Sequence, residues 1–270
     1  MLSRTFAVAA GLVASVASVA FGQLQLTPES YVFFLQDTAD RGYYLRAFDS
    51  GGDLYAEVQF DVGVLPTYTG FATVGNRIFA VTYPDPHQLL VEFDSTTGEL
   101  IAEHEINEPE IIIGLDSDQT NLFLNGFNEW TGEMTTSGQF LGSIDKPSSF
   151  GGGGALAIYD GSFYYYDESS HEIVEADRDG NVLDTIDMSG FRIIPDCLDY
   201  DPASDEFLLS GHGRVWRYDR QGQLLSELAL TGFGSSFHVG FEYHPVPIPA
   251  PGGLAGMMLL PLGFGRRPRR

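Results

Sequence analysis

The stretch Val215-Trp-Arg-Tyr-Asp-Arg-Gln-Gly-Gln-Leu224 decides the fold, because the chain repeats it. It consists of an apolar strand, a tight turn that contains a glycine, and the start of a second apolar strand. A close copy is Ile173-Val-Glu-Ala-Asp-Arg-Asp-Gly-Asn-Val182, and further copies begin at Tyr44, Leu90 and, in a degenerate form, Trp130. A glycine in such a turn supplies the positive φ that a tight hairpin needs.

The turn glycines of the five copies are regularly spaced. They are Gly52, Gly98, Gly138, Gly180 and Gly222, which lie 46, 40, 42 and 42 residues apart. Two further apolar strands precede each hairpin, and in the fifth copy these are residues 197–200 and 206–210. Four short strands in a unit of about 42 residues are typical of one blade of a β-propeller.

The first repeat lacks a strand that the C-terminal end of the repeat region can supply. The first unit has only three strands, at residues 31–36, 43–48 and 54–60, and residues 239–243 resemble the missing innermost strand. A strand from the far end of the chain would close the ring without a free edge. The sequence therefore predicts an all-β fold, a five-bladed β-propeller of four-stranded blades whose first blade is closed by a C-terminal strand. It resembles β-propellers in general, without the signature of one family.

The predicted propeller domain, residues 23–245, is strongly acidic. All 37 Asp and Glu residues lie in the body of the chain against nine basic residues, which gives the body a formal charge of −28. Nucleic acids and anionic membrane surfaces are poor partners for this domain, because its negative electrostatic field would repel them. Cys197 is the only cysteine, so no internal disulfide supports the fold, and we interpret it as a small buried apolar residue.

The N-terminus has the pattern of a signal peptide. Arg4 precedes an uncharged apolar run from Phe6 to Ala20, which is shorter than the roughly 20 residues of a membrane span. Small residues at Ala20 and Gly22 flank Phe21 as signal peptidase requires. We predict that residues 1–22 are removed by signal peptidase and that the protein is exported, the alternative being an uncleaved anchor helix.

The predicted C-terminal tail, residues 246–270, differs in composition from the body. Its Pro-Ala-Pro stretch leads into an apolar segment, residues 253–264, and then into a cluster of arginines. This order resembles the PEP-CTERM sorting signals of Gram-negative bacteria, which exosortase enzymes are thought to process, although Ala stands where Glu is usual. The matching residues are Pro249, Ala250, Pro251, Arg266, Arg267, Arg269 and Arg270.

The resemblance implies an exosortase-like sorting enzyme as a partner. It also implies a location at the cell surface, in the outer envelope or in the extracellular matrix of a Gram-negative-type bacterium. Membrane contact is then expected only through the termini. The alternative for the tail is an ordinary membrane anchor, although its apolar segment is short and is interrupted by Pro261.

Four histidines are candidate ligands for a divalent or transition metal ion. His87, His171 and His212 lie between the second and third strands of their predicted blades, and His238 lies just before an innermost strand. A propeller would place all four on one face, where imidazoles around a central channel could bind a metal. If the loops hold them apart at the periphery, they are ordinary polar loop residues.

Acidic turns are a second set of candidates. Asp177-Arg-Asp-Gly-Asn181 resembles the start of a calcium loop, but the twelfth position of that loop is Met188, so we favour a structural turn. The turns at residues 116–118 and 199–205 are interpreted in the same way, as structural turns first and weak calcium candidates second.

The loops on the histidine face also carry a possible recognition surface. Its residues are Asn128, Trp130, Phe150 and Phe233. Exposed aromatic rings beside acidic residues suit an extracellular protein or glycan partner, and they could equally plug the channel.

The preferred hypothesis for the function of the whole protein is a non-catalytic binding module, and the alternative is a secreted lyase or hydrolase with a metal or acidic site at the channel mouth. A third possibility is a purely structural matrix component.

Overall fold

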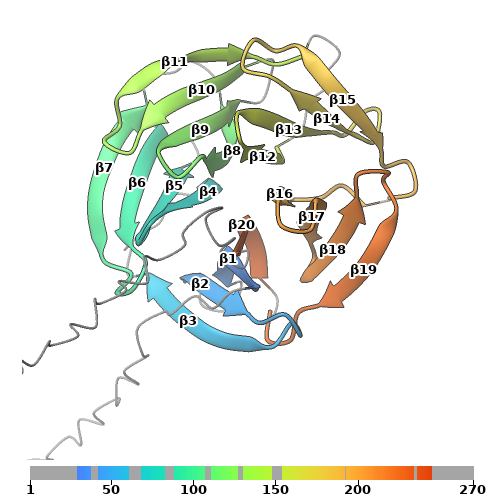
Figure 1. Ribbon diagram of the computed structural model, residues 1–270. Coiled ribbons are helices and arrows are strands. Elements are labelled where there is room, and N and C mark those ends of the chain that lie inside the picture. The colour runs from blue at the N-terminus through green and yellow to red at the C-terminus, as the bar shows by residue number, and fades with distance from the viewer. Residues whose placement is uncertain are drawn as a thin grey trace, which may run out of the picture.

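The computed structural model describes residues 29–37, 42–60, 68–82, 88–106, 111–126, 130–147, 154–191, 193–233 and 236–244. Within these ranges the chain forms twenty β-strands and no helix. The strands make five antiparallel four-stranded sheets arranged in a ring, as Figure 1 shows. The predicted all-β, five-bladed β-propeller is therefore confirmed.

The four strands of each blade follow one another from the channel to the outside of the ring. The first blade contains β20 (Ser236–His244), β1 (Ser30–Asp37), β2 (Tyr43–Phe48) and β3 (Leu54–Phe60), and the second contains β4 (Tyr68–Val74), β5 (Arg77–Thr82), β6 (Gln88–Asp94) and β7 (Leu100–Ile106). The third contains β8 (Ile112–Ser117), β9 (Asn121–Gly126), β10 (Trp130–Thr135) and β11 (Phe140–Asp145). The fourth contains β12 (Leu156–Tyr159), β13 (Ser162–Asp167), β14 (Glu172–Ala176) and β15 (Val182–Asp187). The fifth contains β16 (Cys197–Asp201), β17 (Glu206–Gly211), β18 (Arg214–Asp219) and β19 (Leu224–Ala229).

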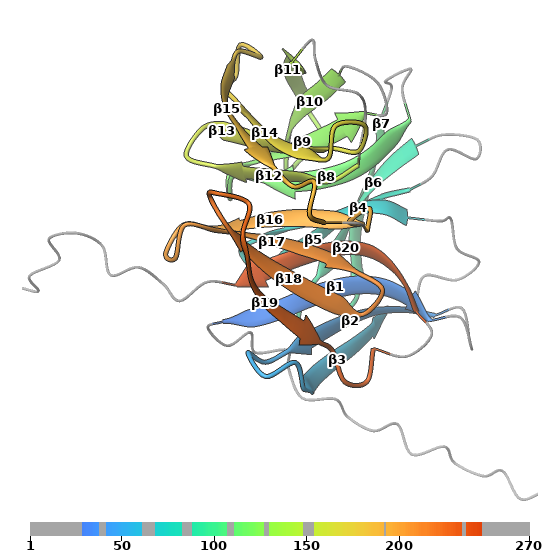
Figure 2. The same ribbon diagram turned by 90° about the vertical axis from the view of Figure 1, so that its right-hand side faces the viewer.

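The ring is closed by β20, as the sequence predicts. This strand pairs antiparallel with β1 from Ser30 opposite His244 to Asp37 opposite Ser236. In both views the first and last strands of the chain lie side by side (Figures 1 and 2). A second contact joins the first and fifth blades, since the Thr231 amide, just after β19, donates to the Gly52 carbonyl in the turn between β2 and β3 at 2.8 Å.

The turn glycines have two structural roles. All five have positive φ, between 71° and 83°. They also allow each hairpin turn to pack on the outer strand of the preceding blade, because a Cβ at Gly222 would lie 2.1 Å from the Asp187 carbonyl oxygen. An aspartate at the start of four of the turns fixes their shape, and Thr135 takes this place in the third blade, where its Oγ1 accepts the Gln139 amide at 3.0 Å. In the turn at residues 177–181, for example, Asp177 Oδ1 accepts the amides of Asp179 and Asn181 at 2.9 Å.

The core lies between neighbouring blades. Side chains alternate along each strand, so both faces of a blade can pack against the adjacent blades. Tyr164 of the fourth blade stacks on Tyr200 of the fifth with ring centroids 5.0 Å apart. Phe34 of the first blade stacks on Phe71 of the second at 5.7 Å. Cys197 is a free thiol, so this aromatic packing supports the ring without a disulfide in the described chain.

Candidate binding site at the mouth of the central channel

The propeller has two faces, which we name by the connections that form them. The turns between the first and second strands of the blades form the turn face, for example at residues 202–205. The connections between the second and third strands form the opposite loop face, for example at residues 212–213. Each innermost strand therefore ends at the turn face.

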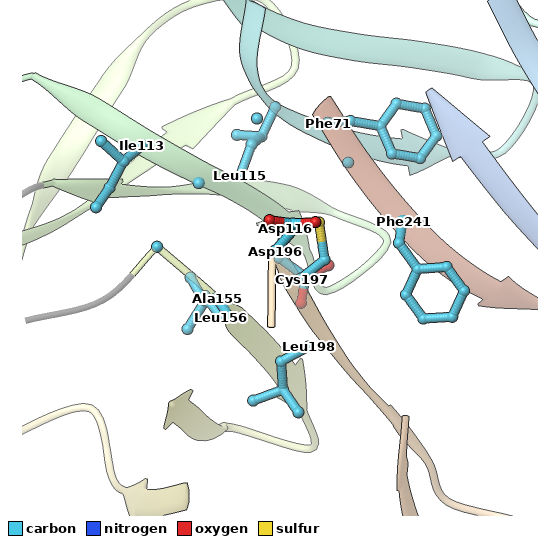
Figure 3. A pocket seen from close by; sticks show the side chains of 14 residues that line it. Phe71, Ile113, Leu115, Asp116, Ala155, Leu156, Asp196, Cys197, Leu198 and Phe241 are labelled. Atoms are coloured by element: carbon cyan, nitrogen blue, oxygen red, sulfur yellow. The ribbon is translucent and has the colours of Figure 1, made fainter. Parts of the chain in front are cut away.

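The central channel is too narrow to hold a ligand. Its cavity measures about 20 Å³, which is close to the space of one water molecule. Figure 3 shows the side chains of Asp116, Asp196 and Cys197 close together at its centre, whereas the rings of Phe71 and Phe241 point away from it. The innermost strands of all five blades lie close together around the channel. Glycine permits this close approach, because a Cβ at Gly240 would lie 2.2 Å from the Cβ of Phe71. Burial raises the pKa of the Cys197 thiol, so it stays protonated.

A second, wider cavity of about 480 Å³ lies on the turn face and shares Asp116 with the channel, and we call it the cup. This volume is within the usual range of small-molecule sites. The cup is lined by the ends of the innermost strands and by the turns that follow them. Its residues are Asp116, Ser117, Asp118, Gln119, Ile158, Tyr159, Asp160, Asp199, Tyr200, Pro202 and Tyr243.

Asp199 is the carboxylate most changed by its surroundings. Its Oδ2 accepts the Tyr243 amide at 2.6 Å and its Oδ1 accepts the Tyr200 amide at 2.7 Å, so two strands hold it in place. Part of its surface is open to the cup, while protein encloses the rest. Desolvation raises the pKa of Asp199 to about 7, although the two amide hydrogen bonds act in the opposite direction; the nearby Asp201 charge contributes further to the increase.

Tyrosine rings form one side of the cup. The centroids of the Tyr159 and Tyr200 rings are 5.5 Å apart, and Tyr159 is 41% exposed. The Tyr200 hydroxyl donates to Asp205 Oδ1 at 2.6 Å, which orients the ring. Arginine guanidinium groups lie near two rings of the wall, Arg220 at 5.6 Å from the Tyr200 centroid and Arg217 at 5.3 Å from the Tyr243 centroid.

The other carboxylates of the cup lie in or next to two turns. Asp116 lies near the end of β8 and Asp118 follows this strand, where its Oδ1 accepts the amides of Thr120 and Asn121 at 2.9 and 2.7 Å. Asp160 has a φ of 49° in the turn after β12. Among the described residues that line the cup, four are aspartates and none is basic. The cup therefore combines negative charge with aromatic surface.

The structure places two of the four candidate histidines. His171 and His212 lie on the loop face, in the turns after β13 and β17, and both have positive φ. His171 Nδ1 is 3.1 Å from the Tyr166 hydroxyl, whereas His212 is exposed. His87 lies outside the described residues. His238 lies within β20 and not before it, and its side chain is not described.

The described side chains do not form a metal site. No group of three or more His, Cys, Asp or Glu residues among them is placed to hold a metal ion. The acidic turns at residues 116–118 and 199–205 do come together, as parts of the cup wall, but they do not converge as metal ligands.

The predicted recognition residues do not form one exposed surface in the described part of the chain. Trp130 is partly buried and lies against Gly132, where a Cβ would come within 2.5 Å of the indole. Phe233 is 5% exposed and packs in the core, with its ring 5.4 Å from that of Phe33. Asn128 and Phe150 lie outside the described residues. Phe233 is therefore a core residue and not an exposed contact.

Both terminal signals lie outside the described residues. These are the predicted signal peptide, residues 1–22, and the sorting motif with Pro249, Ala250, Pro251 and the four terminal arginines. Across the ranges that the structure covers, there is no helix with the length and apolar character needed to cross a membrane.

Of the solved structures compared below, the chain from the nidogen/laminin complex supports the fold. No family model and no curated protein matches this chain. A chain in the crystal structure of a nidogen/laminin complex has 12% sequence identity and a TM-score of 0.53, covering 79% of this chain and 84% of that one. The Myxococcus xanthus glutaminyl cyclase structure has 15% identity and a TM-score of 0.47, covering 66% of this chain and 81% of the other.

A protein of unknown function from Bacteroides caccae has 11% identity and a TM-score of 0.49, covering 80% of this chain and 98% of the other. These identities are too low to carry a function from any of the three proteins to this chain. The class that fold and site together define is a five-bladed β-propeller with a closed channel and an acidic, tyrosine-lined cup.

Proposed function

We propose that this protein is an exported, surface-displayed β-propeller that acts as a binding module, with the cup as its ligand site. The observation that carries the proposal is the cup itself, a cavity of about 480 Å³ beside a closed channel. It combines several convergent polar groups with aromatic walls, as ligand sites usually do. Its residues come from four blades, so the assembled ring holds them in fixed positions.

The last described strand ends next to the cup. Tyr243 lines the cup, and β20 ends at His244 on the turn face.

The proposed export can be tested by intact-mass analysis of the protein extracted from the cell surface. We expect a mature chain that begins at Gln23 and lacks the C-terminal tail, because signal peptidase and an exosortase-like enzyme would remove the two ends. A surface protein that retains residues 246–270 would contradict processing and would leave a simple anchor. A protein that keeps residues 1–22 would contradict the cleaved signal peptide.

Ligand binding can be tested by calorimetric titration of the full chain with three probes of different charge, namely spermidine, cellobiose and citrate. We expect at least one probe to bind and its affinity to fall by about tenfold or more in Pro202→Trp, because the added ring fills the cup. Ser170→Trp, which adds the same ring at an exposed position outside the cup, should bind like the original protein. If no probe binds, or if binding is equal in both variants, the cup is not the ligand site.

One observation supports the alternative of a secreted hydrolase or lyase. Asp199 has a pKa of about 7 inside a cavity of substrate size, which suits a general acid or base near neutral pH. An enzyme of this kind would convert a bound probe into product, and Asp199→Asn would abolish turnover while the folded protein still bound the probe. A bound probe recovered unchanged after long incubation supports the binding module instead.

A further inference from the structure

We infer that the cup binds a flexible organic amine with two or more ammonium groups and the size of a linear polyamine. This inference rests on the proposed function of the cup as a ligand site. The inference combines three properties of the cup: the charge of its wall, its volume and its aromatic surface. Each property alone fits several ligands, but together they favour an extended organic cation.

The charge of the wall favours a cation. Asp116, Asp118, Asp160 and Asp199 line the cup, and no Lys or Arg is among its described lining residues. They belong to three different blades, so the negative charge is spread around the mouth. A small anion in the cup would be repelled by these carboxylates, because no basic residue is among the described residues of its lining.

The spacing of the carboxylates favours an extended cation over a single metal ion. A calcium ion requires six to eight oxygen ligands at about 2.3–2.6 Å. The described side chains do not converge in this way, and the cup has a volume of about 480 Å³. Several ammonium groups separated by methylene chains can reach carboxylates on different sides of such a cavity.

The tyrosine wall suits the rest of an amine ligand. Methylene groups next to an ammonium can pack on the partly exposed ring of Tyr159, while the ammonium is attracted to the face of a ring. The wall rings already have cationic neighbours within the protein, since Arg220 lies 5.6 Å from the centroid of Tyr200 and Arg217 lies 5.3 Å from that of Tyr243. A ligand ammonium would be repelled by these two guanidinium groups, so Tyr159 is the ring of the wall that suits it.

The inference can be tested by titrating the full chain with spermidine at two ionic strengths. Asp116→Asn/Asp160→Asn should weaken spermidine binding by about tenfold or more, because two charge-assisted contacts are lost. The matched control Glu103→Gln/Glu168→Gln removes the same charge from exposed positions outside the cup. It should change the affinity by less than about twofold. Equal losses in both double variants would mean diffuse attraction to an acidic protein and would overturn the inference.

The affinity for spermidine measured over a range of pH tests the role of Asp199 independently. Its charged neighbour is Asp201 on the same strand, which pairs with Arg217 of β18, while Asp116, Asp118 and Asp160 are the other carboxylates that line the cup. Cys197 of β16 and Tyr243 of β20 stay uncharged near neutral pH because their pKa values are raised. An ammonium ligand requires the ionised carboxylate, so spermidine binding should fall by about tenfold between about pH 8 and about pH 6. In Asp199→Asn this dependence should disappear.

The outcomes separate this inference from the proposed function. If cellobiose or citrate binds in a way that Pro202→Trp abolishes, while spermidine does not bind, the cup is a ligand site and the amine assignment is wrong. If none of the probes binds, the inference and the proposed function fail together. Circular dichroism of every variant checks that it is folded, so a loss of affinity reports on the cup and not on unfolding.

Discussion

Deletion of residues 236–244 is expected to leave the chain unable to fold. These residues form β20, the innermost strand of the first blade, and their loss would expose the edge of β1 to the channel and open the ring between β4 and β16. The strand also brings Phe241 to 4.9 Å from Phe33 and Tyr243 to 5.3 Å from Tyr31, measured between ring centroids.

The expected loss of folding free energy can be estimated from the interactions that the deletion of β20 removes. Burial of each aromatic side chain contributes about 1.5–3 kcal/mol, and a whole ladder of backbone hydrogen bonds is removed with them. The sum approaches the roughly 5–15 kcal/mol by which a domain of this kind is stable. Circular dichroism should show the loss of the β spectrum, and urea titration should show no cooperative transition.

A chain that ends after His244 is the control for this deletion. It keeps β20 and lacks only residues outside the described fold, so its urea midpoint should match that of the longer chain. A chain without residues 236–244 that unfolds cooperatively at that same midpoint would contradict the closure of the ring by β20.

Substitution of Gly114 by valine is expected to have the second largest effect. A Cβ at this position would lie 2.3 Å from the carbonyl oxygen of Gly154 and 3.3 Å from the Cβ of Asn125. The nearest obstacle is backbone, so the inner strands of the third and fourth blades would have to move apart. Forced overpacking typically costs about 1–3 kcal/mol, and a contact with rigid backbone should reach about 3 kcal/mol or more.

Urea denaturation measures this loss directly, and Gly190→Ala provides a matched control. A Cβ at Gly190 would meet nothing within 4 Å, and this glycine has no positive φ. The control should therefore stay within about 1 kcal/mol of the original protein, with a small gain from the reduced freedom of the unfolded chain. Equal stability of both variants would show that the inner strands do not pack as closely as described.

Much of the fold could be predicted from the sequence because its determinants are local and repeated. A hairpin turn such as residues 219–223 is shaped by a leading aspartate and a glycine with positive φ, and both are visible in the sequence. Counting the copies then predicted five blades, and the missing strand of the first copy predicted closure by a C-terminal strand. The number of blades and their closure were both confirmed.

The candidate site was only partly predictable. The acidic turns at residues 116–118 and 199–205 could be recognised, but their proximity could not, because they are about 80 residues apart in the chain. Phe233 has a loop position and an aromatic ring, which suggested an exposed contact. Its burial depends on how Phe33 and Phe48 of the first blade pack around it.

The sequence by itself determined the repeat, the strand order, the closing strand and the acidity of this protein, since turns and strand periodicity depend on neighbouring residues. Only the tertiary structure decided that the channel is closed, that the cup opens on the turn face, and that the pKa of Asp199 is raised to about 7. These properties depend on the distances between innermost strands of different blades. Glycines such as Gly114 and Gly240 permit those short distances, but the close packing exists only in the assembled ring.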